Sequence, residues 1–171
     1  MPLARSNDPL VWIDCEMTGL DPDHDTILQI CCIITDAQLN VLEPEGFDAV
    51  IHHSDSVLDH MSACAAEAAD SLLAYIRRHV PTPRTALLAG NSVHADKAFL
   101  ARGPYARVLE HLHYRLLDVS SLKEAARRWG SEELLAQVPV KREVHLARDD
   151  ILESIAEMRF YREKLFAPGR E

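Results

Sequence analysis

Two acidic residues stand one residue apart at the end of an apolar run near the start of the chain. The run is LVWIDCEM (residues 10–17), and its acids are Asp14 and Glu16. Successive side chains of a β-strand point to opposite faces, so these carboxylates would share one face, with Cα atoms roughly 6.5 Å apart at about 3.3 Å per residue. Burying two like charges together costs several kcal/mol unless something neutralises them. A divalent cation would do so; alternatively, the strand lies at a sheet edge and its acids face water.

Three further residues could join this pair. Asp96 follows a short apolar stretch and opens a predicted helix, where the carboxyl end of a strand would bring it near a site. His145 and Asp150 lie five residues apart at the start of the last predicted helix. Each acid alone is also explained by a favourable interaction with a helix N-terminus. Together, the five residues predict a centre for two metal ions.

The chemistry of such a centre explains these residue types. Two Mg²⁺ or Mn²⁺ ions about 4 Å apart would straddle a phosphodiester; one would generate hydroxide from water, and the other would stabilise the leaving 3′ oxygen. These hard cations prefer the carboxylate oxygens of Asp and Glu to thiolates. A histidine, whose pKa lies near neutrality, suits the removal of a proton from the attacking water.

The elements that must carry these residues follow from hydrophobic patterning. Apolar β-branched or alternating runs predict strands, and apolar residues at helical spacing predict helices. The predicted strands are 10–17, 26–36, 47–53, 85–92 and 114–121, and the predicted helices are 65–80, 94–102, 121–129 and 147–166. Three consecutive strands on short connections predict an antiparallel meander, and the helix–strand alternation after it predicts a mixed sheet flanked by helices. That is the layout of the five-stranded, ribonuclease H-like α/β fold.

Length and composition limit the class of protein. The 171 residues predict one domain, residues 10–166, with tails at 1–9 and 167–171. No apolar stretch reaches the roughly 18 residues of a membrane span, and the first ten residues lack an apolar signal core. The net charge of −9 argues against wrapping long nucleic acid, but it allows an enzyme that grips a short one through bound metal ions.

The four cysteines, none of them in a CxxC pair, predict buried thiols rather than a disulfide framework or a zinc site. Buried thiols indicate a reducing compartment. We therefore expect an intracellular protein, cytoplasmic if the source is a bacterium and mitochondrial or cytosolic if it is a eukaryote.

Four longer motifs resemble the oligoribonuclease family, DEDDh-type 3′→5′ exonucleases that degrade very short RNAs. They are WIDCEMTGLD, AGNSVHADKAFL, HYRLLDVSSLKEAARRW and HLARDDILESIAEMRFYR, and the resemblance extends from Leu10 to Arg162. It implies a 3′→5′ exoribonuclease that hydrolyses short oligoribonucleotides, especially dinucleotides, to nucleoside 5′-monophosphates. The implied metal ligands are Asp14, Glu16, Asp96 and Asp150, with His145 as the general base and Asp149 as a neighbour that is not a ligand.

The resemblance also implies a substrate pocket. Met17 and Leu20 would pack against nucleobases, with Leu20 as a wedge between two of them. Ser92, Arg115 and Ser120 would cap the 5′ phosphate of a dinucleotide. The residues alone leave alternatives open, because Met17 and Leu20 could be plain core and Ser120 could be the N-cap of the helix that follows it.

The family works as a homodimer, and Tyr114 would reach the neighbouring subunit. The sequence departs from the family in two places. After Met61 a segment of roughly twenty residues, which in the family contains Trp and His and helps to hold substrate, is missing. Either the chain has lost it or the printed sequence omits it, and the second is our expectation. The other departure is Leu146, where the family usually has a polar residue, but the spacing from histidine to acid is intact.

Three other functions compete with this hypothesis. IDCEMT resembles the DxDxT nucleophile loop of haloacid-dehalogenase-type phosphatases, in which the first Asp attacks phosphorus. A binding module could have kept the fold and lost activity, although all five catalytic positions are filled here. A DEDDh exonuclease acting on longer RNA or DNA, of the proofreading type, is the stronger alternative, but it would lack the HYRLLDVSS stretch.

Overall fold

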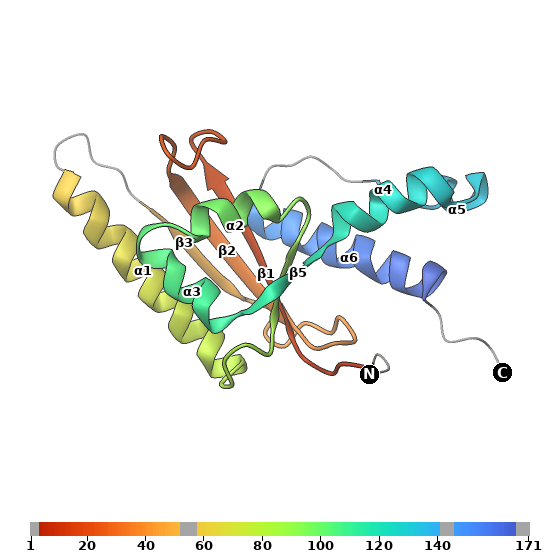
Figure 1. Ribbon diagram of the computed structural model, residues 1–171, viewed down its shortest axis with the longest axis horizontal. Coiled ribbons are helices and arrows are strands. Elements are labelled where there is room, and N and C mark those ends of the chain that lie inside the picture. Colours follow the sequence, from red (N-terminus) through yellow and green to blue (C-terminus); the bar gives the residue numbers. More distant parts are fainter. Residues whose placement is uncertain (1–3, 52–57, 141–145, 167–171) are drawn as a thin grey trace.

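The computed structural model of the protein describes residues 4–51, 58–140 and 146–166, and its centre is one five-stranded sheet (Figure 1). The strands are β1 (Leu10–Met17), β2 (Ile27–Thr35), β3 (Phe47–Val50), β4 (Leu87–Gly90) and β5 (His113–Asp118). Their order is β3-β2-β1-β4-β5. β1, β2 and β3 pair antiparallel, whereas β4 runs parallel to β1 and β5 parallel to β4. The predicted meander and mixed sheet are confirmed, and because β1 is the central strand, the edge-strand explanation of its acids is wrong.

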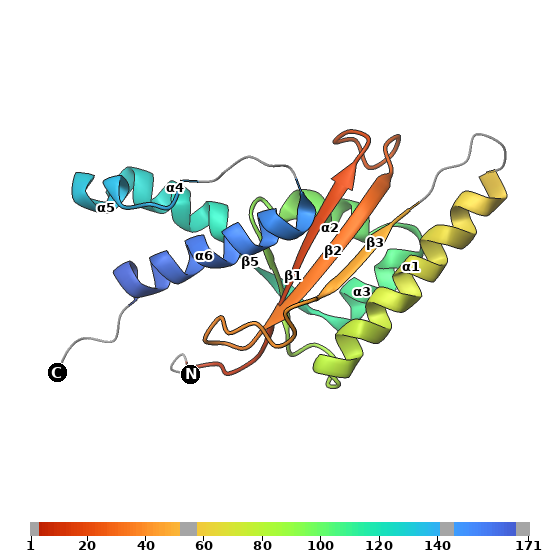
Figure 2. The same ribbon diagram turned by 180° about the vertical axis from the view of Figure 1, so that it is seen from behind.

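Helices cover both faces of the sheet (Figures 1 and 2). They are α1 (Leu58–His79), α2 (His94–Leu100), the 3₁₀ turn η1 (Gly103–Tyr105), α3 (Ala106–His111), α4 (Val119–Trp129), α5 (Glu132–Ala136) and α6 (Ala147–Leu165). The elements α1, α2, η1 and α3 pack on one face of the sheet, and α4 and α6 pack on the other. Sequence analysis predicted α1, α2, α4 and α6 but not the three shortest elements, because three to six residues are too few to show a helical period.

The alternation of side chains along β1 decides which face each residue serves. Val11, Ile13 and Cys15 are buried in the core cluster under α1, α2 and α3. Trp12 is buried in the opposite cluster, against α6, where its indole Nε1 donates a hydrogen bond to Thr35 Oγ1 at 3.0 Å. Asp14 and Glu16 are in phase with Trp12, so they point to the face that α6 covers.

The cysteines are free, as predicted. Cys15, Cys31 and Cys32 are buried in β1 and β2, as predicted, but Cys64 on α1 is exposed, so the prediction of burial is wrong for that cysteine. Burial raises the pKa of the Cys31 thiol to about 12. In the described part of the chain, no helix combines the length and the apolar character that crossing a membrane requires.

Candidate active site

Three carboxylates meet where the end of β1 approaches the start of α6. Ligand oxygens of Asp14, Glu16 and Asp150 all lie within 4.8 Å of one another, and each residue is partly buried. β1 supplies the first two on one face. Asp150 is in the first turn of α6, where its backbone N–H donates to the carbonyl of Leu146 at 3.0 Å. Residues 136 positions apart in the sequence are therefore brought together by the packing of α6 on the sheet.

Asp96 approaches the same place from the other side of β1. It lies in the first turn of α2 and is only 7% exposed. β4 pairs with β1 only as far as the Trp12–Ala89 partners. Beyond that point the Cys15 N–H donates to Asp96 Oδ1 at 2.9 Å. Asp96 is thus bonded to the backbone of the residue between Asp14 and Glu16, although it is not one of the three clustered acids.

The electrostatics of these acids favour a cation. Burial raises the pKa of Asp96 to about 6, and hydrogen bonds from backbone N–H groups oppose that shift. Three more carboxyl groups within 4.8 Å of one another repel when ionised. A set of carboxylate oxygens is what Mg²⁺ and Mn²⁺ prefer, so the residues present fit a divalent metal ion. His145, the predicted general base, lies outside the described residues, two positions before α6 begins at Ala147.

The turn after β1 holds Leu20 in solvent. The Asp25 carboxylate organises this turn, accepting hydrogen bonds from Thr18 Oγ1 at 2.8 Å and from the Asp21 N–H at 3.0 Å. A Cβ at Gly19 would lie 2.3 Å from Asp25 Oδ2, so a larger residue there would have to displace this carboxylate and its hydrogen bonds. Leu20 is 81% exposed, and the alternative that it is a core residue is wrong.

Met17, at the end of β1, is partly buried and packs against the core under α1. The alternative that Met17 is a core residue therefore holds in part, because its side chain is packed against the core but not fully buried.

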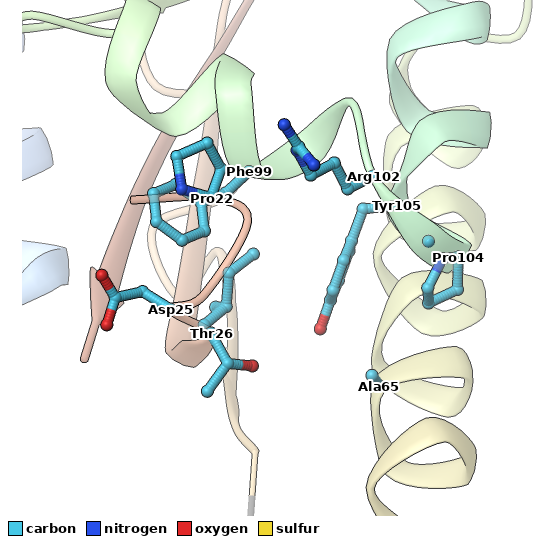
Figure 3. A pocket seen from close by; sticks show the side chains of 10 residues that line it. Pro22, Asp25, Thr26, Ala65, Phe99, Arg102, Pro104 and Tyr105 are labelled. Carbon is cyan, nitrogen blue, oxygen red and sulfur yellow. The ribbon is translucent and has the colours of Figure 1, made fainter. Parts of the chain in front are cut away.

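A cavity of about 170 Å³ lies behind this turn, between it, α1 and η1 (Figure 3). The Tyr105 ring projects into the space between the turn and α1, while the Asp25 carboxylate points away from it. The buried Tyr105 hydroxyl has no hydrogen-bond partner. None of the clustered acids lines this cavity, so it belongs to the support of the turn and not to the metal site.

Ser92 and Ser120 form a second polar centre at the ends of β4 and β5. Their hydroxyl oxygens are 3.0 Å apart, and the Ser92 N–H donates to Ser120 Oγ at 2.9 Å. Ser92 has a φ of 52°, in the left-handed region that non-glycine residues rarely adopt. Asp118 Oδ1 accepts hydrogen bonds from the N–H groups of both serines. Asp118 is therefore the N-cap of α4, and the alternative that Ser120 is the cap is wrong.

Tyr114 and Arg115 lie on β5, upstream of Ser120 on the same segment. Both are exposed, Tyr114 to 71%. The Arg115 guanidinium carbon lies 5.3 Å from the centre of the Tyr114 ring, a cation–π contact. The structure thus brings the two serines together but stacks Arg115 on Tyr114.

Sequence analysis missed a buried polar group behind the serines. Asn91, Ser154 and Glu157 are joined by hydrogen bonds, and Asn91 also accepts one from Ser120. A signal was present in the last helix: Ser154, Glu157 and Tyr161 recur at three- and four-residue spacing, as one buried stripe of a helix does.

The model of the exonuclease family matches residues 11–65 and 53–158, which together span most of the chain. With acids at and beside the end of its central strand, the protein is therefore a member of the exonuclease family with a ribonuclease H-like fold. Exonuclease I from Methylocaldum szegediense superposes with a TM-score of 0.61 at 23% identity, over 92% of this chain and 41% of that one. Escherichia coli exonuclease I in complex with a dA16 oligonucleotide gives 0.60 at 20% identity, over 91% and 41%. These likenesses show the fold, and the chain spans about two fifths of those structures.

Full-length relatives narrow the class. Oligoribonuclease from Mycobacterium avium is 45% identical over 184 positions, covering 95% of this chain and 84% of the relative. That from Streptomyces avermitilis is 44% identical, covering 95% and 89%. The mitochondrial oligoribonuclease of Saccharomyces cerevisiae is 40% identical, covering 95% and 70%. The chain belongs to the oligoribonuclease family, and the phosphatase interpretation of IDCEMT is wrong.

The segment missing after Met61 is absent from the chain itself. The printed sequence runs from residue 1 to residue 171 with none left out after Met61, so our expectation that a segment had been omitted there is wrong. Alignments to relatives run over 181 to 189 positions, longer than this chain. The match to the family model consists of two ranges, which overlap at residues 53–65. The relatives therefore carry residues that this protein lacks.

Proposed function

We propose that the protein is a 3′→5′ exoribonuclease that hydrolyses short oligoribonucleotides, especially dinucleotides, to nucleoside 5′-monophosphates by a two-metal mechanism. One observation carries the proposal: Asp14 and Glu16 of β1 meet Asp150 of α6 within 4.8 Å, in a chain that belongs to the oligoribonuclease family.

Asp14, Glu16, Asp96 and Asp150 would hold two divalent cations, Mg²⁺ or Mn²⁺. When bound, the ions supply positive charge at the scissile phosphate, which favours attack by water and departure of the 3′ oxygen. His145 would take the proton of the attacking water, because a neutral imidazole is a suitable base near pH 7. Its position just before α6 places it two residues from the helix that carries Asp150.

The remaining residues would bind the substrate. Leu20 projects from its turn and would separate the two nucleobases, with Met17 beneath them. Ser92 and Ser120 would receive the 5′ phosphate, joined by Arg115, whose guanidinium can pair with two phosphate oxygens. Such a cap closes the site at two nucleotides, because a third would have to displace it.

Activity should fall as the RNA grows longer. A protein of charge −9 gains little from extra phosphates, and the cap selects the shortest substrate. We expect kcat/KM to be highest for a dinucleotide with a 5′ phosphate and to decrease through seven nucleotides. Arg115→Ala should remove most of this preference, about tenfold or more for one charged hydrogen-bonding group, and spare an unphosphorylated dinucleotide.

Arg77→Ala, which removes an exposed arginine on α1, is the matched control and should keep the length profile. Rates that rise with length in the wild-type protein would contradict the cap. They would indicate instead an exonuclease with an open channel for longer RNA or DNA.

We further propose a homodimer in which Tyr114 reaches the site of the partner. Large apolar side chains are exposed at the α4–α5 end of the molecule, including Trp129 at 82% and Val140 at 93%, and a two-fold interface would cover them. Sedimentation should give twice the 19.2 kDa chain mass. Tyr114→Ala should lower kcat/KM, whereas a fully active monomer at assay concentration would remove the cross-subunit part of the site.

The proposed compartment is a reducing one, because the four cysteines are free. It would be the cytoplasm in a bacterium, and the mitochondrion or cytosol in a eukaryote.

A further inference from the structure

A buried carboxylate, Glu157 on α6, lies behind the two serines and has no part in the chemistry described so far. It is 1% exposed, and three donors surround it. Lys123 Nζ lies 3.0 Å from Oε1, the Tyr161 hydroxyl donates to Oε1 at 3.3 Å, and Asn91 Nδ2 donates to Oε2 at 3.1 Å. An ammonium, a hydroxyl and an amide N–H₂ all face this carboxylate, and a carboxylate group so surrounded serves only as a hydrogen-bond acceptor.

This restriction fixes the orientation of the Asn91 side chain. Its amide nitrogen must face Glu157, and it also donates to Ser154 Oγ at 3.2 Å. Ser154 can accept because its own hydrogen is donated to the Asp150 carbonyl at 2.8 Å. Asn91 Oδ1 must therefore point the other way, toward Ser120, which donates to it at 2.8 Å.

The orientation of Asn91 in turn decides which serine is the donor. A hydroxyl has one hydrogen, and that of Ser120 lies on Asn91. In the 3.0 Å contact between the hydroxyls, Ser92 must then donate and Ser120 must accept. The Ser92 hydroxyl hydrogen, held by a single acceptor, can turn onto an anionic oxygen that arrives at the site.

We propose that Glu157 is a positioning residue that acts through Asn91 and Ser120 to fix Ser92 as a hydrogen-bond donor to the 5′ phosphate of the substrate. This inference rests on the phosphate cap proposed above and names a residue that determines its specificity. Glu157 itself touches neither phosphate nor metal in this arrangement. Glu157 acts by setting which group donates and which accepts in each hydrogen bond of the chain that runs from Lys123 to Ser92.

Two double variants test whether Glu157 acts through its hydrogen-bond acceptor oxygen or through its negative charge. Both carry Lys123→Met, so neither leaves an unpaired buried charge, and replacing a whole buried ion pair is often tolerated. In the first, Glu157→Gln keeps an oxygen that can face Asn91, because no lysine now competes for it. In the second, Glu157→Leu has similar bulk but offers no acceptor. Glu163→Leu, on the exposed side of α6, is the matched control.

The readouts are the affinity for a dinucleotide with and without a 5′ phosphate, measured by calorimetry in EDTA, and the ratio of kcat/KM for the same two compounds with Mn²⁺. The leucine double variant should bind the phosphorylated dinucleotide about tenfold more weakly, through a higher KM, and the unphosphorylated one within about twofold of wild type. The glutamine double variant and the control should keep the wild-type preference. Adding Ser92→Ala to the leucine variant should cause no further loss, because the two changes break one chain.

A leucine variant that keeps the phosphate preference, or that loses affinity for both compounds equally, overturns the positioning role. So does a glutamine variant that loses as much as the leucine variant. A wild-type protein that shows no preference for the 5′ phosphate overturns the phosphate cap itself, and that result is visible before any variant is compared.

Discussion

Asp14→Asn is expected to lower kcat by roughly 10³-fold or more while the fold survives, because the lost charge is a direct ligand of the proposed metal ions. Asn keeps the size of Asp, and it removes one of three like charges whose oxygens lie within 4.8 Å. The metal-free variant should therefore unfold at a temperature no lower than the metal-free wild type, since less repulsion remains. Turnover of a dinucleotide and thermal unfolding in EDTA measure the two effects.

Asp149→Asn is the matched control, one residue from Asp150 on the same turn of α6 but outside the clustered acids. It should retain turnover within about threefold, as most changes away from a site do. EDTA should abolish hydrolysis by the wild-type protein, and Mg²⁺ or Mn²⁺ should restore it. Full activity in EDTA would contradict the two-metal mechanism, and an active Asp14→Asn protein would contradict the ligand assignment.

His145→Ala is expected to lower kcat by roughly 10²–10⁴-fold, the usual contribution of a general base. The proposed metal ligands are carboxylates and do not include His145, so the affinity for Mn²⁺ should change little. Calorimetric titration of Mn²⁺ beside the kinetics distinguishes a base from a ligand.

Leu146→Ala is the control for His145→Ala, because Leu146 is exposed, adjoins the histidine and is the N-cap residue of α6. It should leave kcat nearly unchanged. A collapse of Mn²⁺ affinity in His145→Ala would show that the histidine is a ligand and that the assigned role is wrong.

Much of this protein was determined by its sequence alone. The alternation in LVWIDCEM was sufficient to place Asp14 and Glu16 on one face, because side-chain direction in a strand depends only on position. The meander, the mixed sheet and the helix that carries Asp150 followed from hydrophobic periodicity and its change along the chain. These are local properties, set by backbone geometry and by which residues must leave water.

The tertiary structure decided what depends on distant parts of the chain. No local pattern shows that β1 is central, that Asp96 bonds to the Cys15 amide, or that Asp118 and not Ser120 caps α4. The role of Glu157 was equally hidden, since a glutamate in a helix normally faces solvent. Only the packing of α6 in the folded protein encloses Glu157 between Lys123 and Asn91. There the carboxylate only accepts hydrogen bonds, and this fixes which group donates in each hydrogen bond from Asn91 to Ser92.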